Sequence, residues 1–415
     1  MPSLSDRLQS LGVKVGTRNL PTSKLKPCPE HPIESVLPGD RWLTPHGEVF
    51  FVETKYSANF QAGKVELRPT ASLEILAAWA RAPQLSNLRL EQFAFIDTET
   101  TGLAGGSGTY MFLIGVGRFE GDEFRLVQFF LQDPAEETAQ LAALEEFLAP
   151  CEAFVSFNGK SFDLPIINTR FITNGWPVPL PDAPHLDLLH MARRLWKARL
   201  PSRTLGDLEV KILGMQRSEE DVPGWMVPDL YFDYLHTGDA RPLRGVFYHN
   251  EVDVVSMAAL LNHISRIVAD PLNYPIEYGL DIISIGKLYA DLGHLDQAAR
   301  IYQRGMEHGD LPNQAYWAAA EQLSFIHKRR GDFSAAHSLW EMAAAKGHLY
   351  AHEELAKRYE HHNKDFEKAL SWTQKALEIL TKDDSLRLKR IQWQEALEHR
   401  KNRLEKKLLR HSDQD

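Results

Sequence analysis

The sequence is poor in cysteine, because its 415 residues include only Cys28 and Cys151. Two cysteines cannot form a disulfide framework or a zinc site built on cysteine pairs. The sequence also lacks a run of about 18 apolar residues of the kind that crosses a membrane. Its first residues, MPSLSDRLQSLG, lack the apolar segment of a signal peptide. We therefore expect a cytoplasmic protein without a membrane partner.

An excess of basic residues is missing as well. The formal net charge is −9, from 47 Lys and Arg against 56 Asp and Glu. Residues 1–263 contain 24 basic and 33 acidic residues, whereas residues 264–415 contain 23 of each. Nucleic-acid-binding proteins usually present a basic surface, so the net charge by itself argues against such a partner. All of the excess acid, however, lies in the first two thirds of the chain.

The composition is that of a globular protein, since 43% of the residues are hydrophobic and 25% are charged. The length of 415 residues indicates two to three domains. We divide the chain into an N-terminal extension (1–86), an α/β domain (87–269) and a helical repeat domain (270–415). The extension contains short β-type runs over residues 40–67, which we interpret as a small β appendage, either a packing element or a substrate lid.

The α/β domain is predicted from strand-like and helical runs. Three adjacent strand-like runs, FAFID (93–97), TYMFLIGVGRF (109–119) and FRLVQFFL (124–131), precede a helix at 136–148 and a strand at 153–158. Several neighbouring strands followed by alternating helix and strand favour a mixed sheet flanked by helices.

The helical domain is internally repetitive. The segments GHLDQA (293–298), GDFSAA (331–336) and KDFEKA (364–369) align position by position, at spacings of 38 and 33 residues. Helix–turn–helix units of about 34 residues are typical of tetratricopeptide repeats. A basic stretch, residues 387–410, ends the array with nine basic and three acidic residues. It is either a nucleic-acid-binding arm or a helix that caps the repeats.

Acidic residues occur where the predicted elements are otherwise apolar. Asp97 and Glu99 end a strand in FIDTETTGL, and residues two apart on a strand share a face. A buried face rejects two like charges unless a cation lies between them, and oxygen ligands suit Mg²⁺ or Mn²⁺. Asp163 follows in VSFNGKSFDLPII (155–167), and Asp253 follows in the apolar helix HNEVDVVSMAALL (249–261).

The motifs DTETTGL, NGKSFD and HNxxD, in this order, resemble those of the DEDD superfamily of 3′–5′ exonucleases, which have a ribonuclease-H-like fold. The chain is more closely similar to the YprB-type proteins, in which such a domain precedes tetratricopeptide repeats. The segments 185–196 and 221–235 also fit that family. The resemblance covers residues 40–263 well and the repeats loosely.

The resemblance implies hydrolysis of phosphodiester bonds with two Mg²⁺ or Mn²⁺ ions. Asp97 would bridge both ions, Glu99 and Asp253 would complete the site of the attacking water, and Asp163 would hold the second ion. Two cations in such a site stabilise the attacking and leaving oxygens of an in-line displacement.

A further group must orient or deprotonate the water. The superfamily's two subtypes place Tyr four residues, or His five residues, before the last Asp. Here the two side chains are exchanged, because His249 precedes Asp253 by four residues and Tyr248 precedes it by five. We favour His249, which lies beside Asp253 on a helix and has a pKa suited to base chemistry near neutrality. Tyr248 is the alternative.

Residues near these motifs are candidates for substrate binding, and the substrate that we expect is single-stranded DNA or RNA. Arg193 and Arg194 begin a basic run, residues 193–203, that contains no acid and includes Trp196, as expected for a groove that follows a nucleic-acid strand. A solvated helix face would give the same pattern. The remaining candidates follow the carboxylate motifs and are Thr100, Gly102, Leu103, Asn158 and Lys160.

Three functions are compatible with these observations. The first is a metal-dependent 3′–5′ exonuclease for single strands, with the repeats binding a protein partner or positioning the substrate. The second is a non-catalytic nucleic-acid-binding or scaffold protein, although a scaffold has no need of four acids in this arrangement. The third is a structure-specific endonuclease with the same metal site. Metal ions bound by the proposed carboxylates would neutralise the acidic excess, so we expect nucleic-acid binding to be weak, metal-dependent and sensitive to salt.

Overall fold

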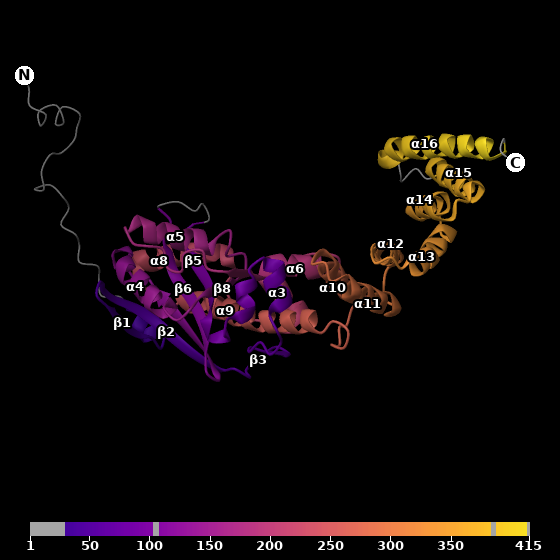
Figure 1. Ribbon diagram of the computed structural model, residues 1–415. Helices are drawn as coiled ribbons and strands as arrows, with labels where there is room; N and C mark the ends of the chain where they lie inside the picture. The colour runs from indigo at the N-terminus through magenta and orange to yellow at the C-terminus, as the bar shows by residue number, and fades with distance from the viewer. Residues whose placement is uncertain (1–29, 103–107, 383–386, 413–415) are drawn as a thin grey trace, which may run out of the picture.

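The computed structural model describes residues 30–102, 108–382 and 387–412, and it shows a sheet-based domain followed by an array of helices (Figure 1). The main sheet has seven strands in the order β1-β2-β7-β6-β5-β8-β9. Only the β5–β8 and β8–β9 pairs are parallel, which confirms the predicted mixed sheet. In chain order the strands are β1 (Asp40–Thr44), β2 (Gly47–Ser57), β5 (Phe93–Thr100), β6 (Met111–Glu120), β7 (Glu123–Phe130), β8 (Ala153–Ser156) and β9 (His185–Asp187).

The predicted N-terminal β segment is present, and its first two strands are continuous with the main sheet. β2 pairs with β7 along its length, from Phe50 opposite Phe130 to Ser57 opposite Glu123. The short strands β3 (Gln61–Ala62) and β4 (Val65–Glu66) form a separate two-stranded sheet. There the side chain of Asn262, on helix α9 (Leu243–Ala269), donates a hydrogen bond to the carbonyl of Glu66. Of the two roles that we considered for this segment, packing is the one that these contacts support.

Helices cover both faces of the sheet. On one face, α4 (Glu137–Leu148) and α5 (Asp163–Thr173) bury a cluster that includes Ala94 and Ile96 of β5. On the other face, α9, α6 (Leu188–Trp196) and α3 (Glu74–Ala80) bury Phe93 and Phe95 of the same strand. Because side chains alternate along a strand, Asp97 continues the row that faces α9. The period-2 pattern of β5 therefore places its acidic end on the α9 side.

Shorter helical elements connect these layers. They are α2 (Ile33–Val36), η2 (Pro83–Asn87), η3 (Leu90–Gln92), η4 (Pro134–Glu136), α7 (Leu205–Leu208), η5 (Glu209–Leu213), η6 (Gly224–Met226) and α8 (Val227–Thr237). By length and composition, α9 is one helix of the described chain that could cross a membrane, but 72% of its apolar window is buried inside the protein. We interpret α9 as the central core helix of the fold.

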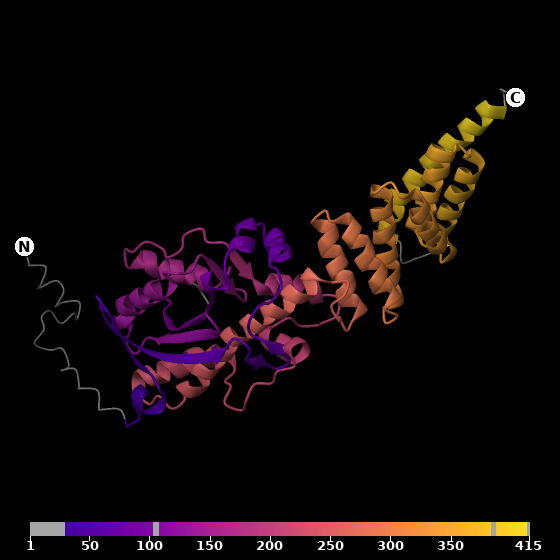
Figure 2. The same cartoon turned by 60° about the horizontal axis from the view of Figure 1, so that its bottom comes forward.

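The C-terminal part is all helical and extends away from the sheet (Figure 2). Its helices are α10 (Gly279–Asp291), α11 (Leu295–Glu307), α12 (Asn313–Arg329), α13 (Phe333–Ala345), α14 (Leu349–Arg358), η7 (Tyr359–Asn363), α15 (Phe366–Lys382) and α16 (Arg387–Ser412).

The three segments aligned in the sequence adopt the same local structure. Their first residues, Gly293, Gly331 and Lys364, all have left-handed backbones, with φ of 87°, 79° and 57°. Their last residues, Ala298, Ala336 and Ala369, are completely buried near the start of the following helix. A left-handed residue ends one helix, and a small residue allows the next helix to pack closely. This shared geometry supports the interpretation of the segments as repeats.

The basic C-terminal helix α16 directs three of its cationic side chains toward the preceding helices of the array. Glu360, whose side chain is fully buried, forms ion pairs with Arg400, Arg403 and Lys407 of α16. These cations are therefore engaged in holding α16 against the preceding helices. Of the two roles we considered for this helix, the contacts favour capping of the array.

Candidate active site

A cavity of about 500 Å³ lies where β5 ends and α5 begins. Three of the four predicted carboxylates line it, namely Asp97, Glu99 and Asp163. The predicted substrate-binding residues Thr100, Gly102 and Asn158 line it as well, whereas Leu103 lies outside the described residues. The rest of the lining is formed by Thr98, Phe157, Ser161, Phe162, Pro165, Ile166, Thr169, Gly224 and Pro228.

Asp97 is held on the α9 side of the sheet by an asparagine. The side-chain nitrogen of Asn250 donates a hydrogen bond of 2.8 Å to Oδ2 of Asp97, and Oδ1 of Asn250 accepts one of 2.9 Å from Gln128. Gly115, opposite Asp97 on β6, makes room for this contact. A Cβ atom at Gly115 would lie 2.1 Å from Oδ1 of Asn250. The glycine therefore lets α9 approach the strand closely enough to fix the carboxylate.

Asp163 is anchored to β5 from the other side. Its Oδ1 accepts hydrogen bonds from the backbone nitrogen and the hydroxyl of Thr98, at 2.9 and 2.6 Å. The preceding turn depends on Gly159, where a Cβ atom would lie 2.4 Å from Oγ of Ser156 and 3.0 Å from Oδ2 of Asp163. The Asn-Gly turn thus sets the position at which α5 presents its first carboxylate.

The carboxylates repel one another. Burial raises the pKa of Asp97 and of Glu99 well above the usual range, and the charges of Asp253 and Asp163 raise both further. Burial also raises the pKa of Asp163, to about 6, against the opposing hydrogen bonds from Thr98. The pKa of Asp253 is raised by burial too, although Arg217 and His249 oppose the shift. The fold thus concentrates negative charge that a cation would stabilise.

The donor set fits a divalent metal ion that prefers oxygen ligands. Asp97, Asp163 and Asp253 each have one oxygen held by a protein donor, so their second oxygens are left for another partner. Carboxylates arranged in this way are the ligands that Mg²⁺ and Mn²⁺ prefer. No three His, Cys, Asp or Glu side chains in the described residues are already gathered into a metal-binding cluster. The assignment of the four carboxylates as metal ligands therefore stays a prediction.

His249 points toward Asp253, as its position four residues earlier on α9 requires. Its Nε2 lies 3.7 Å from Oδ2 of Asp253, and its Nδ1 lies 2.8 Å from Oδ1 of Asp221. Asp221 thus orients the imidazole from the opposite side. Tyr248 is directed elsewhere, because its hydroxyl accepts a hydrogen bond of 2.8 Å from the backbone of Ser218. The geometry favours His249 as the group beside the metal-ligand candidates.

An arginine that we did not single out from the sequence joins this group. Arg217 donates hydrogen bonds to both Glu209 and Asp253, and its Nη1 lies 3.1 Å from Nδ1 of His249. Arg217 and Glu209 come from the segment between α6 and α8, where the sequence shows no motif that would relate them to Asp253. For Asn250, which holds Asp97, there was a weak indication in the sequence, because this residue lies inside the HNxxD motif. Only the folded chain brings these residues together.

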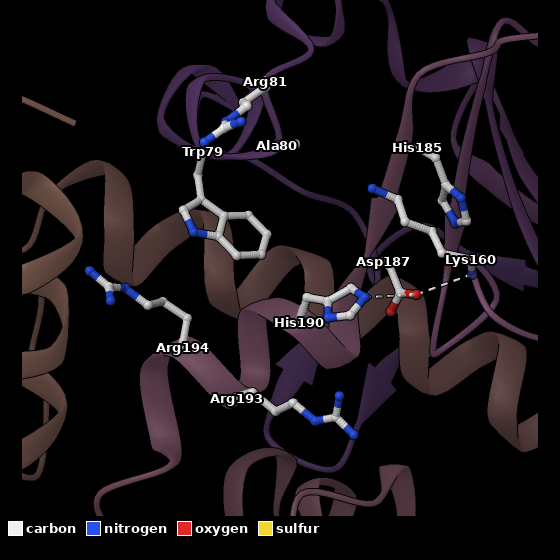
Figure 3. A pocket seen from close by; sticks show the side chains of 9 residues that line it. All are labelled: Trp79, Ala80, Arg81, Lys160, His185, Asp187, His190, Arg193 and Arg194. Carbon is white, nitrogen blue, oxygen red and sulfur yellow. Dashed lines mark hydrogen bonds and ion pairs between the residues drawn. The ribbon is translucent and has the colours of Figure 1, made fainter. Parts of the chain in front are cut away.

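The remaining predicted substrate-binding residues line a neighbouring pocket. Lys160, Arg193 and Arg194 surround it together with Trp79, Ala80, Arg81, His185, Asp187 and His190 (Figure 3). Arg194 also forms an ion pair of 2.5 Å with Asp291 of α10, so it connects α6 to the helical array. Asp187 caps α6, because its side chain accepts a hydrogen bond from the backbone nitrogen of Leu189.

Comparisons with known proteins show which families this chain is similar to. A model of the RNase H superfamily matches residues 94–265, the segment from β5 to α9 that carries all four carboxylates. The chain is 35% identical over 290 residues to the uncharacterized protein YprB of Bacillus subtilis (strain 168), and the match covers 68% of each chain. A solved structure, the family B DNA polymerase of Pyrobaculum calidifontis, superposes with a TM-score of 0.32 and 16% identity. That match covers 48% of this chain but only 29% of the polymerase.

Proposed function

The chain belongs to the family of Bacillus subtilis YprB and contains an RNase H superfamily domain over residues 94–265, and on this premise we propose that it is a metal-dependent 3′–5′ exonuclease of single-stranded nucleic acid. The observation that carries the proposal is that carboxylates from two elements line one cavity and interact electrostatically with a fourth carboxylate from a third element. Asp97 and Glu99 of β5 and Asp163 of α5 line the cavity, and the charge of Asp253 on α9 raises the pKa of both Asp97 and Glu99. Their mutual repulsion weakens the fold unless a cation binds, which a purely structural cluster would not require.

Each carboxylate has a role that follows from its position. Bound divalent ions would supply Lewis-acid stabilisation of the attacking and leaving oxygens at phosphorus. Asp97, between the other acids, would hold both ions, while Asp163 would hold one from the α5 side. Glu99 and Asp253 would complete the side on which His249 lies. Hydrogen bonds from Asn250 and Thr98 keep these carboxylates in place before the ions arrive, so little reorganisation is needed.

His249 is suited to accept the proton of the attacking water. Its Nδ1 lies within hydrogen-bonding distance of both the carboxylate of Asp221 and the guanidinium of Arg217, and its Nε2 is directed toward the carboxylates. A general base in this role contributes a factor of about 10² to 10⁴ to the rate.

Incubation of the purified full-length protein with 5′-labelled single strands and Mn²⁺ or Mg²⁺ tests the proposal. We expect a ladder of products shortened from the 3′ end, no cleavage in EDTA, and no cleavage by Asp97→Ala. A strand with a blocked 3′ end and a circular strand serve as controls and should resist cleavage. Internal cuts in the circle would instead identify an endonuclease. Binding without any cleavage would support the non-catalytic alternative.

We further propose that the repeats are of the tetratricopeptide type and bind a protein partner. The support is the shared left-handed turn at Gly293, Gly331 and Lys364, followed each time by a buried alanine. Affinity capture with the full chain, compared with a chain truncated after α9, tests this. A partner retained only by the full chain is expected, and one retained equally by both would contradict the assignment.

A further inference from the structure

The pocket beside the active site is strongly basic. It has a volume of about 440 Å³ and lies between α3, the 158–161 turn, β9 and α6. Four of its lining residues, Arg81, Lys160, Arg193 and Arg194, carry permanent positive charge, and only one, Asp187, is acidic. Figure 3 shows these side chains arranged around a common space, with the indole of Trp79 on one side and His190 opposite.

The one acid of the pocket is already committed to backbone donors. The carboxylate of Asp187 is almost completely buried and accepts hydrogen bonds from the backbone nitrogens of Asn158 (2.8 Å), Lys160 (3.2 Å) and Leu189 (3.1 Å). These bonds fasten the 158–161 turn to the start of α6. Oδ2 of Asp187 also lies 3.8 Å from Nε2 of His190, so the carboxylate is already engaged and is poorly placed to neutralise the arginine and lysine side chains around it.

Most of the cations lack a carboxylate partner. Arg194 is paired with Asp291. In the part of the chain that the structure describes, Arg81, Lys160 and Arg193 form no ion pair, and all three are exposed. The positive field reaches His185 on the pocket wall, whose pKa is lowered to about 4 by burial and by the charge of Lys160. A pocket of this kind attracts an anion with several charges.

The pocket adjoins the proposed active site across the 158–161 turn. Asn158 and Ser161 line the carboxylate cavity, and Lys160, between them in the sequence, lines the basic pocket. One turn of the chain therefore separates the two cavities. A strand whose 3′ end lies among the carboxylates would need to cross only this turn to bring its preceding phosphates beside the cations.

We propose that the basic pocket binds the phosphodiester backbone of the nucleic-acid strand just upstream of the scissile bond, with a base stacked on Trp79. This inference rests on the proposed exonuclease function. Arginine side chains suit phosphate because their planar groups can donate two hydrogen bonds at once, and an aromatic ring stacks on any base. The enzyme should therefore favour a strand of several nucleotides over a mononucleotide ester.

Substitution of the two exposed arginines, Arg81 and Arg193, tests the contribution of this pocket to strand binding independently of catalysis. Binding of a 5′-fluorescein-labelled 12-mer of thymidylate is measured by anisotropy in Mn²⁺, with Asp97→Asn as the non-cleaving parent. We expect Arg81→Gln/Arg193→Gln to weaken binding at least tenfold. A plot of the logarithm of the association constant against the logarithm of the salt concentration has a negative slope. That slope should become shallower by about 1.4, because two phosphate contacts to a single strand are lost. Lys55→Gln, exposed on β2 and outside both cavities, is the matched control and should change neither quantity.

Activity on a small substrate distinguishes failure of this inference from failure of the proposed function. With Asp97 restored, the double variant should hydrolyse the p-nitrophenyl ester of thymidine 5′-phosphate at the wild-type rate but cleave the 12-mer less efficiently. If the wild type cleaves both substrates and the double variant binds the 12-mer normally, the pocket assignment is wrong and the nuclease assignment stands. If the wild type cleaves neither, the proposed function fails first.

Trp79 gives an independent test. Trp79→Leu should weaken binding of the 12-mer about tenfold while leaving the salt slope unchanged, because stacking releases no counterions. Poly-glutamate of matched charge should compete at least tenfold less well than unlabelled 12-mer. Equal competition would show a site for acidic polypeptides and overturn the proposal.

Discussion

Arg217 is paired with Asp253 across 36 residues of sequence, although Asp253 is a predicted metal ligand. The same guanidinium pairs with Glu209, whose side chain is only 1% exposed. Arg217 thus connects a structural acid to a candidate catalytic one. Because Asp253 has one oxygen bound to Arg217 and the other facing His249, this arginine fixes the orientation of the carboxylate before a metal ion binds.

We predict that Arg217→Gln lowers both stability and activity. Glu209 would be left buried without its cation, and breaking such a pair costs about 3 to 5 kcal/mol. In the double variant Glu209→Gln/Arg217→Gln the unpaired charge is removed, so stability should return while cleavage stays low. Urea unfolding and the cleavage assay measure the two effects. Recovery of activity together with stability would show that Arg217 does not position Asp253.

The repulsion among the carboxylates predicts a more stable Asp97→Asn variant. The pKa of Asp97 is raised in the folded protein, so the wild type loses stability as the pH rises above about 4, the usual pKa of an aspartate in an unfolded chain. Asparagine removes that loss. In EDTA at pH 7.5 we expect a gain of more than about 1 kcal/mol, or several degrees in melting temperature.

Scanning calorimetry at pH 4 and pH 7.5 checks whether the variant is the more stable protein at the higher pH. At pH 4 the melting temperatures of the wild type and the variant should converge. Addition of Mn²⁺ at pH 7.5 should raise the melting temperature of the wild type but hardly that of the variant. A variant less stable than the wild type in EDTA at pH 7.5 would contradict the repulsion that we infer.

The position of His249 predicts a difference between two neighbouring substitutions. His249→Ala should lower the cleavage rate about 10² to 10⁴-fold, because the candidate base is lost. Tyr248→Phe should change the rate less than about threefold, since its hydroxyl only accepts a bond from the Ser218 backbone. Single-turnover rates with saturating strand measure both. A large loss in Tyr248→Phe with an active His249→Ala would reverse the assignment.

The buried Glu360 predicts a local effect in the helical array. Glu360→Gln leaves Arg400, Arg403 and Lys407 without their shared anion, so α16 should lose protection from hydrogen exchange. Burial raises the pKa of Glu360, but hydrogen bonds and charges from Arg403 and Lys407 outweigh it and lower the pKa to about 2, so acid should release α16 only as the pH falls toward that value. Glu405→Gln, on the same helix, is a control expected to leave exchange unchanged, and cleavage of short strands should be unaffected in both variants.

The acidic motifs and the repeat units were predictable because each is local. The alternation in FAFIDTET sets which face of β5 carries Asp97, and a helical period of four sets His249 beside Asp253. The turns at Gly293 and Gly331 were recognisable because a left-handed residue followed by an amphipathic helix leaves a repeated pattern. In each case the relevant interaction spans only a few residues.

Other features depend on contacts between distant segments. The integration of β1 and β2 into the main sheet follows from pairing between β2 and β7, which hydrophobic alternation alone does not specify. The approach of Asn250 to Asp97 requires Gly115 on a third element.

The sequence by itself determined that this chain carries four carboxylates on otherwise apolar strands and helices, in an order that indicates a nuclease, and that a helical array follows them. Only the tertiary structure decided which oxygens are held by Asn250, Thr98 and Arg217, and that Lys160 and Arg193 meet Trp79 at a second pocket. The reason is physical. Backbone periodicity fixes the face on which a side chain lies, whereas its partner across the fold is fixed by packing between elements that the sequence separates.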